Sequence, residues 1–225
     1  MILCLTCFLL AGCGSDESDD PFTFEQAKED IEAQEALGLI DQGTDDASAS
    51  EANTLYKQAE DFFEKGEYLK AKETMLRAYA AFEKQVFKDR ATRVKYLRLL
   101  TDTSYFMNEG DETILYATQV ADLALSNDDR GFAYGRIGGA YYDKGEYDKS
   151  IGYYEKALAV DRDSAWIYGG LGDAYYSKGE YDKAIGYYEK SLAISLKALG
   201  PDHPDVAATY NNIGSAYRKK GEYDK

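Results

Sequence analysis

Few residues of this 225-residue chain have the types and spacing that catalysis or metal binding requires. His203, the only histidine, lies between Asp202 and Asp205, so it could ligate a metal ion or form an acid–base pair. Pro201 and Pro204 frame it, however, and Asp205 is placed to cap a helix that follows. We therefore expect a turn and a helix cap here, with no metal ion and no cofactor.

Other catalytic patterns are weak or missing. Residues 170–173, Gly-Leu-Gly-Asp, begin like a phosphate-binding loop but lack its third glycine and a preceding strand. The 41 acidic residues contain no pair that spacing singles out for glycosidic chemistry, so a solvated surface explains them. The chain also has no His-Glu-x-x-His motif, nucleophile elbow, Walker loop or Cys-His pair. We expect that the protein is not an enzyme.

All three cysteines, Cys4, Cys7 and Cys13, lie in the first 13 residues, so the rest of the chain has no thiol for a disulfide or a metal site. These 13 residues are apolar and uncharged. They are too short to span a membrane, which needs about 20 residues, but they suit the core of a signal peptide. They end in Leu-Ala-Gly-Cys at residues 10–13, which resembles the bacterial lipobox, where cleavage precedes a cysteine that is then acylated.

The lipobox resemblance implies a lipoprotein signal peptide over residues 1–12 and a lipidated Cys13. Several acyl chains would hold the protein stably on a bacterial membrane, at its periplasmic or outer face. Two alternatives stay open. Cys13 could belong by chance to an ordinary cleaved signal, and the absence of Lys or Arg after Met1 leaves room for a start codon further upstream.

Most of the negative charge is confined to the segment after Cys13. Residues 14–51 contain thirteen acidic residues and one base, Lys28, which gives a net charge of −12 out of −15 for the whole chain. Such a composition is typical of a solvated tether, and its acids lack the ordered spacing of a calcium loop. The sequence has no basic patch and a pI near 4.5, so we expect no binding to nucleic acid.

Two capping boxes divide this acidic segment. Residues 23–26, Thr-Phe-Glu-Gln, predict the start of a short helix that Gly38 would end, and residues 41–48 have linker composition. Residues 48–51, Ser-Ala-Ser-Glu, form the second box, and we expect it to open the first helix of a repeat array. Residues 13–50 would then be an acidic linker with one short helix.

A short phrase, Gly-Glu-Tyr-Asp-Lys, recurs in the second half of the chain. It begins at Gly145, Gly179 and Gly221, with a weaker relative at Gly66. The first two glycines of the full phrase are 34 residues apart and the next pair 42, so the period is 34 with one insertion of eight residues. A fixed period of this size indicates an array of structural repeats.

Each repeat has the pattern of two helices joined by a turn. Apolar and small residues before the turn at Gly145 fall at helical spacing on one face: Tyr134, Ile137, Gly138 and Tyr141. A second stripe follows the turn: Ser150, Tyr154, Ala157 and Leu158. Each unit is therefore predicted to be a helical hairpin that buries both stripes against its neighbours.

The next repeat resembles the tetratricopeptide (TPR) repeat in the order of its residues: Tyr168, Leu171, Gly172, Tyr175, Ala184, Tyr188, Ser191 and Leu192. The resemblance implies an all-α fold, a right-handed superhelical solenoid of TPR hairpins over residues 51–225. The expected repeats are 52–85, 96–130, 131–164, 165–198 and 207–225. The second is degenerate, with its turn expected at residues 110–112. The inserted residues 199–206 resemble part of the 42-residue unit of kinesin light chains.

Residues 207–225 supply only the first helix of a last repeat. Either the gene product is truncated, or residues 207–220 are the polar capping helix that such arrays need. Five residues would give this helix its polar side: Asn211, Asn212, Ser215, Arg218 and Lys219.

In TPR proteins the first helix of each hairpin lines a concave groove that holds a segment of another protein. Carried over residue by residue, the resemblance places nine residues in that groove: Phe132, Tyr142, Asp143, Trp166, Asp173, Tyr176, Asn211, Ser215 and Arg218. The positions that hold a C-terminal carboxylate in co-chaperone TPR domains carry Gly135, Gly139, Gly169 and Asp173 instead. We therefore expect an uncharged or apolar segment to bind.

Together these features predict a bacterial lipoprotein whose TPR solenoid is an adaptor, held on a membrane by Cys13 and recruiting another envelope protein or peptide segment. A small-ligand or glycan-binding module of the envelope is the alternative, because aromatic concave faces can also hold sugars. A truncated, inactive gene product is a further alternative.

Overall fold

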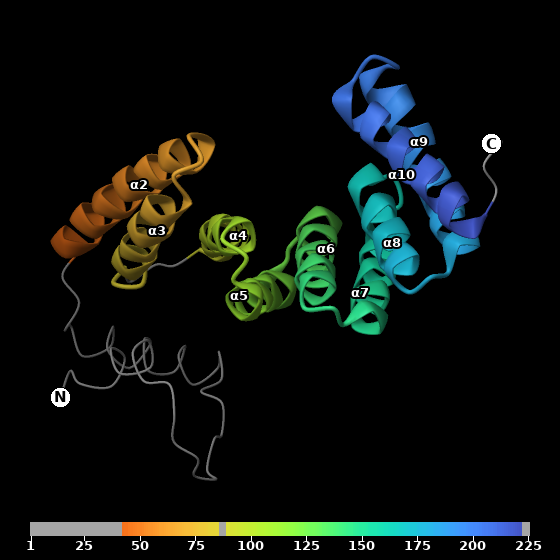
Figure 1. Ribbon diagram of the computed structural model, residues 1–225. Helices are drawn as coiled ribbons and strands as arrows, with labels where there is room; N and C mark the ends of the chain where they lie inside the picture. Colours follow the sequence, from red (N-terminus) through yellow and green to blue (C-terminus); the bar gives the residue numbers. More distant parts are fainter. Residues whose placement is uncertain (1–41, 86–88, 222–225) are drawn as a thin grey trace, which may run out of the picture. The chain divides into compact units, whose positions relative to one another are not determined.

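The computed structural model describes residues 42–85 and 89–221, where all of the regular structure is α-helical (Figure 1). Its nine helices are α2 (Gln42–Glu64), α3 (Tyr68–Phe82), α4 (Arg90–Phe106), α5 (Gly110–Leu123), α6 (Asn127–Asp143), α7 (Tyr147–Val160), α8 (Ala165–Ser177), α9 (Tyr181–Leu199) and α10 (Pro204–Lys220). The predicted signal peptide, Cys13 and the short helix after residue 23 lie outside the described residues. None of the described helices is long and apolar enough to cross a membrane.

The helices pack in consecutive pairs, which confirms the expected all-α fold class. α2 packs against α3, α4 against α5, α6 against α7, and α8 against α9, while α10 packs on α9. First helices also contact each other across repeats, α2 with α4, α4 with α6, and α6 with α8. The second helices of the described pairs make no comparable contact with one another. The first helices therefore line one face of the array, which we call the inner face.

The recurring glycines form the turns inside the pairs. Gly66, Gly145 and Gly179 have φ angles of +74°, +74° and +79°, a left-handed conformation that favours glycine. The amide of Gly145 donates to the carbonyl of Tyr142 (2.8 Å), which closes the end of α6. The same bond forms from Gly66 and from Gly179. The phrase read from the sequence is thus a helix-ending motif that fixes the angle between paired helices.

The second repeat makes the same turn with a different residue. Asn108 takes the left-handed position at a φ of +58°, and its amide donates to the carbonyl of Tyr105. Asparagine tolerates this conformation better than most non-glycine residues. The prediction of a turn at residues 110–112 is therefore wrong, because α5 already begins at Gly110 and Asn108 replaces the repeated glycine.

The first helices of the first two repeats begin earlier than predicted. α2 runs through the expected capping box, and within it the Ser50 carbonyl accepts a hydrogen bond from the Thr54 hydroxyl (2.8 Å). α4 begins at Arg90 because Asp89 caps it, accepting from the amide of Thr92 (2.7 Å). The second box thus lies inside a helix, and the second repeat begins ahead of residue 96.

The turn around the only histidine ends in a helix cap, as predicted, but the capping residue differs. Nδ1 of His203 accepts a hydrogen bond from the amide of Asp205 (3.2 Å), and Pro204 occupies the first turn of α10. His203 is therefore the N-cap, and the assignment of that role to Asp205 is wrong. Asp205 instead places a negative charge in the first turn of the helix, where the helix dipole favours it.

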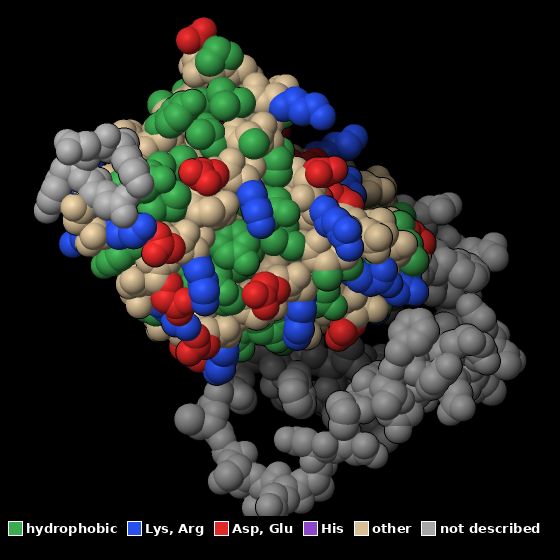
Figure 2. All heavy atoms as spheres, turned by 90° about the vertical axis from the view of Figure 1, so that its right-hand side faces the viewer, with side chains coloured by type: hydrophobic (Ala, Val, Ile, Leu, Met, Phe, Trp, Pro, Cys, Tyr) green, Lys and Arg blue, Asp and Glu red, His purple; other side chains and the backbone are tan. Residues whose placement is uncertain are grey.

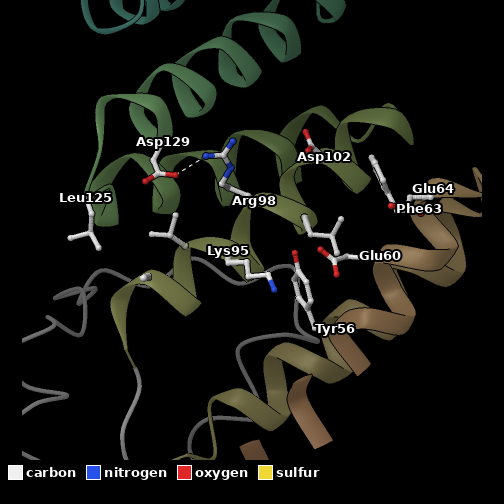
Figure 3. Close-up of a pocket in the computed structure, with 12 residues that line it drawn as sticks. Tyr56, Glu60, Phe63, Glu64, Lys95, Arg98, Asp102, Leu125 and Asp129 are labelled. Atoms are coloured by element: carbon white, nitrogen blue, oxygen red, sulfur yellow. Dashed lines mark hydrogen bonds and ion pairs between the residues drawn. The ribbon is translucent and has the colours of Figure 1, made fainter. Parts of the chain in front are cut away.

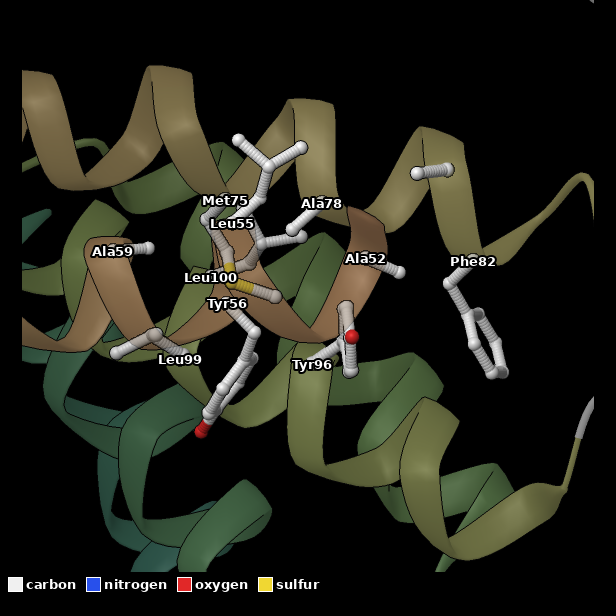
Figure 4. Packing of buried hydrophobic residues seen from close by; sticks show 11 residues of the cluster. Ala52, Leu55, Tyr56, Ala59, Met75, Ala78, Phe82, Tyr96, Leu99 and Leu100 are labelled. Atoms are coloured by element: carbon white, nitrogen blue, oxygen red, sulfur yellow. The ribbon is translucent and has the colours of Figure 1, made fainter. Parts of the chain in front are cut away.

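Apolar side chains form a series of clusters along the array. The first cluster joins α2, α3 and α4 through residues that include Tyr56, Met75, Phe82, Tyr96 and Leu100 (Figure 4). A second cluster joins α4, α5 and α6, and a third joins α7, α8, α9 and α10. Each repeat therefore buries its apolar stripes by packing on the next repeat, as in a solenoid.

Two tyrosines of the second helices pack against glycines of the first helices. The ring of Tyr188, on α9, lies so close to α8 that a Cβ added at Gly172 would be 2.4 Å from it. Tyr154, on α7, stands in the same way against Gly138 of α6 and Gly170 of α8. These glycines have ordinary helical backbones, so it is the close approach of the rings that requires them.

Ion pairs connect the turns of successive repeats. In three cases the lysine that precedes a turn glycine reaches an acid of the preceding repeat, as in Lys178 with Asp148 and Lys220 with Asp182. Lys144 pairs with Asp111 in the same way. Because the acids are largely exposed, each pair contributes little to stability. The packing of the helices dominates the stability of the array.

Replacing Gly172 by Ala is expected to lower the free energy of unfolding by roughly 2 kcal/mol, because the new methyl group overlaps the Tyr188 ring. Gly186 on α9 is the matched control, since an added Cβ there meets nothing within 4 Å. Gly186→Ala should stabilise by about 0.5–1 kcal/mol through helix propensity. Urea unfolding followed by circular dichroism measures both. Equal effects of the two substitutions would contradict the packing described for Tyr188.

Candidate functional site on the inner face

Trp166 lies at the start of α8 and is 46% exposed, so it lies outside the core. One side of its indole covers Gly135 of α6, where an added Cβ would come within 2.0 Å of the ring. Gly135 stands at a position that binds a carboxylate in co-chaperone TPR domains. Because it has no side chain, it leaves room for Trp166 of the next repeat. Trp166 is therefore both an exposed inner-face residue and a contact between repeats.

Two arginines alternate with two aromatic rings on this face. The guanidinium of Arg98 lies 4.3 Å from the centroid of Phe132, and that of Arg136 lies 5.5 Å from Phe132 and 5.5 Å from Trp166. Arg136 also lies 4.7 Å from the ring of Tyr105. We call Arg98, Phe132, Arg136 and Trp166 the cation–aromatic stack. It joins α4, α6 and α8 through attraction between cations and ring faces.

Carboxylates neutralise both arginines of the stack. Arg98 pairs with Asp128 (2.8 Å) and Asp129 (2.7 Å), at the N-terminus of α6. Nε of Arg136 lies 2.7 Å from Oδ1 of Asp102, although the two atoms lack the alignment of a hydrogen bond. Burial raises the pKa of the Asp102 carboxyl, and the charge of Arg136 opposes that shift. The Asp102 charge is therefore tolerated at neutral pH only because the arginine faces it.

A groove with a volume of about 560 Å³ opens on the inner face of the first two repeats (Figure 3). Its lining combines aromatic, acidic and basic side chains from α2 and α4: Tyr56, Glu60, Phe63, Glu64, Lys95, Arg98 and Asp102. Leu125 and Asp129 complete it from the following repeat. The ammonium of Lys95 lies 3.8 Å from the ring centroid of Tyr56. Burial, with a hydrogen bond to Glu60, raises the pKa of the Tyr56 hydroxyl.

None of these groove residues was among the nine predicted from the sequence. The predicted residues came from the third, fourth and last repeats, whose register is marked by the recurring phrase. The first two repeats lack that phrase in full. Counting back from the turn positions Gly66 and Asn108 places Tyr56 and Arg98 at the position that Gly135 occupies in the third repeat. Counting from the turn could therefore have identified these groove residues. In the second repeat the turn was not recognised, because it carries Asn108 in place of glycine.

Further along the inner face, burial raises the pKa of the Tyr154 hydroxyl, and the charges of Asp173 and Asp143 raise it further. Burial raises the pKa of each carboxyl above its usual range. The Tyr188 hydroxyl donates a hydrogen bond to Oδ1 of Asp173 (2.6 Å), which partly opposes the shift at that residue. Two of the nine predicted residues therefore share one acidic, tyrosine-lined region.

The predicted Tyr142 and Tyr176 occupy equivalent positions in their repeats. The Tyr142 hydroxyl lies 3.2 Å from that of Ser177, and its ring packs 5.7 Å from the ring of Tyr147. Tyr176 packs edge to face on Tyr181 at 5.5 Å. Both rings are half-buried, so they serve packing at the turns as well as the inner face.

The three predicted residues of α10 bond to one another. The Ser215 hydroxyl donates to the carbonyl of Asn211 (2.8 Å), and a guanidinium nitrogen of Arg218 donates to the Ser215 hydroxyl (2.8 Å). Asn211 and Arg218 are exposed. The assignment of all nine residues to a binding groove stays a prediction.

Family models described as tetratricopeptide repeat and TPR repeat match residues 163–225 and 138–178. The models thus identify tetratricopeptide repeats within residues 138–225. The inner face is accordingly the face that the first helices of TPR hairpins line. Proteins built from these repeats act as scaffolds for protein–protein interaction and are usually not enzymes, and no catalytic domain is found in this chain. Among curated proteins, none matches the sequence significantly.

Solved structures share the TPR fold with this chain. A Rap protein complexed with competence and sporulation factor has a TM-score of 0.64 and 21% identity, over 77% of this chain and 50% of its own. The putative kinesin light chain repeats of Podosopora anserina have a TM-score of 0.62 and 19% identity, over 77% and 88%. For MamA the TM-score is 0.56 and the identity 26%, over 78% and 86%. The chain spans about half the length of the Rap proteins that it matches.

Replacing Arg136 by Met is expected to cost roughly 3 kcal/mol of stability at neutral pH, because the partly buried Asp102 loses its counter-charge. The loss of the arginine raises the pKa of Asp102 further. The charge penalty is therefore present above that pKa and disappears as the pH falls and the carboxyl binds a proton. Urea unfolding from neutral to acidic pH measures the effect. In the double variant Arg136→Met, Asp102→Leu most of the loss should be recovered; an additive double variant would contradict the pairing.

Proposed function

We propose that this protein is an adaptor that binds a segment of a partner protein in the groove of its first two repeats. The observation that carries the proposal is the groove itself, about 560 Å³ in volume and open on the inner face. Its Phe63 and Leu125 offer apolar contacts, and Leu125 is 59% exposed. An exposed leucine beside aromatic rings suits the burial of a partner side chain.

The charges of the groove modify the expected partner. Glu60, Glu64 and Lys95 line it, and an entirely apolar segment would remove water from these charges without replacing it by a partner. A segment with an apolar anchor flanked by polar or charged side chains fits the lining better. The expectation of an uncharged or apolar segment is therefore replaced by a segment of mixed character.

A membrane anchor belongs to the same proposal and rests on the sequence alone. Acylation at Cys13 would fix one end of the acidic segment to a bacterial membrane, at its periplasmic or outer face, and leave the TPR array at the other end. Tethering raises the effective concentration of the array near membrane partners without adding any contact. The partner would then be another protein of the cell envelope.

Nucleic acid is not the partner that we propose. On the side of the molecule drawn in Figure 2, Lys and Arg side chains alternate with Asp and Glu, and hydrophobic side chains lie between them. That side offers no surface of a single positive sign. Nucleic-acid binding depends on such a surface to neutralise phosphates, and the chain as a whole has a net charge of −15.

In-cell crosslinking with mass spectrometry tests the groove. The double variant Lys95→Glu, Leu125→Glu should reduce a crosslinked partner at least about tenfold, because it reverses one groove charge and removes one apolar contact. The matched control is Lys156→Glu, Leu69→Glu on the second helices. Lys156 also lies over a tyrosine ring, and Leu69 is 59% exposed like Leu125. A partner that both double variants lose equally, or that neither loses, would refute binding in the groove.

Anchoring is tested separately by Cys13→Ser in cells that process lipoproteins. The wild-type protein should fractionate with membranes, and the variant should appear in the soluble fraction because it has no acylated cysteine. Metabolic labelling with a radioactive fatty acid gives a second readout. Retention of an unlabelled Cys13→Ser protein in the membrane fraction would mean that something other than this cysteine holds it there.

A further inference from the structure

Tyr154 reaches from the second-helix layer to the inner face. It belongs to α7, and its ring passes between α6 and α8. A Cβ added at Gly138 would be 3.0 Å from the near side of the ring, and one added at Gly170 would be 2.6 Å from the hydroxyl. The ring thus crosses between two first helices at positions where both lack side chains, and this passage directs the hydroxyl toward the inner face.

The Tyr154 hydroxyl ends among acidic and tyrosine side chains. Burial raises its pKa most, the neighbouring Tyr105, Asp173 and Asp143 raise it further, and the charge of Arg136 opposes the shift. The Tyr154 side chain is 5% exposed. Within residues 42–85 and 89–221 its hydroxyl has no hydrogen-bond partner. The ring is buried, but the hydroxyl oxygen is not among the buried atoms that lack a partner, so it is reached from the solvent and can bond to a group bound there.

The two carboxylates of this region have no cation of their own. No Lys or Arg of the described residues forms an ion pair with Asp143 or Asp173. The nearest arginine, Arg136, is already paired with Asp102. Asp173 accepts one hydrogen bond, from Tyr188, and this leaves its second oxygen open. The region therefore presents two carboxylates beside tyrosine rings, one half-buried at Asp173 and one exposed at Asp143.

We propose that Asp143, Asp173, Tyr105 and Tyr154, which we call the acid–tyrosine site, bind a lysine or arginine side chain of the partner segment. The inference rests on the proposed function, because the cation arrives on the segment held by the inner face. A cationic side chain would neutralise the two carboxylates through charge-assisted hydrogen bonds, donate to the free Tyr154 hydroxyl and pack its stem against the rings. Charge complementarity favours this occupant over an apolar or anionic one.

The contrast between the two halves of the inner face supports this choice. Asp102 of α4 and Asp128 and Asp129 at the start of α6 are neutralised by the arginines of the cation–aromatic stack. Further along the inner face, Gly135 and Gly169 occupy the position of Arg98. Arg136 of α6 is already paired with Asp102, so Asp143 and Asp173 have no Lys or Arg ion pair among the described residues, and the partner is the available source of positive charge.

The test measures binding of a fluorescein-labelled acetyl-tetralysine amide to the full chain by anisotropy at low salt. The double variant Asp143→Asn, Asp173→Asn should weaken binding about tenfold, since two charge-assisted contacts are lost. The matched control, Glu155→Gln, Glu189→Gln, removes two exposed charges from the second helices and should change affinity less than about twofold. The acidic segment before residue 51 contributes equally to all three proteins. Tyr154→Phe should weaken binding about threefold.

Equal affinity of the probe for the wild-type and Asp143→Asn, Asp173→Asn proteins would overturn the inference, and so would an equal loss in the control. Circular dichroism of each variant separates loss of binding from loss of folding. The outcomes are distinguishable from those of the proposed function. If the groove variants abolish partner capture while the affinity of the probe does not depend on the two carboxylates, the adaptor proposal is supported and the acid–tyrosine site is wrong. If the probe depends on the carboxylates but no partner is captured, the adaptor proposal is wrong.

Discussion

The close approach of neighbouring repeats through glycine is the constraint on which the inner face depends. Tyr154 and Tyr188 reach past Gly138, Gly170 and Gly172 because those positions carry no side chain. Buried rings replace the missing side chains as packing material between helices. The consequence is chemical as well as structural, since each tyrosine hydroxyl emerges among the acids of the first helices, at Asp173 in the case of Tyr188.

The repeat phrase explains why the sequence predicted the fold so well in one half of the chain and less well in the other. Gly145 and Gly179 occupy left-handed turns that favour glycine, so the period of the phrase gives the period of the hairpins directly. In the second repeat Asn108 adopts the same conformation, so the repeated glycine is absent from the sequence there. The prediction then shifted the turn to the next glycine, Gly110. Local conformation can be conserved in space while the residue that signals it changes.

The candidate site was harder to predict, for a related reason. Trp166 could be assigned to the inner face from its position in the repeat, and its exposure agrees. Its contact with Gly135 joins two repeats and depends on how closely α6 and α8 pack. The residue periodicity within one repeat carries no information about that distance. The pairing of Arg136 with Asp102 likewise joins α6 to α4. Sequence patterns identify the face of a helix, but not which side chains of different helices meet across it.

Equivalent positions of successive repeats hold different residues, so the two ends of the inner face differ in chemistry. Arg98 in the second repeat is followed by Gly135 in the third and Gly169 in the fourth, so this position supplies no positive charge beside Asp143 and Asp173. Internal ion pairs neutralise Asp102, Asp128 and Asp129, whereas no Lys or Arg of the described residues pairs with Asp143 or Asp173. A segment with an apolar anchor at one end and a basic side chain at the other would match both halves in one orientation only. Reversing it would place the basic side chain near arginines and the apolar anchor on carboxylates, and both placements cost free energy. The partner's orientation would therefore follow from the loss of a single arginine position between the second and third repeats.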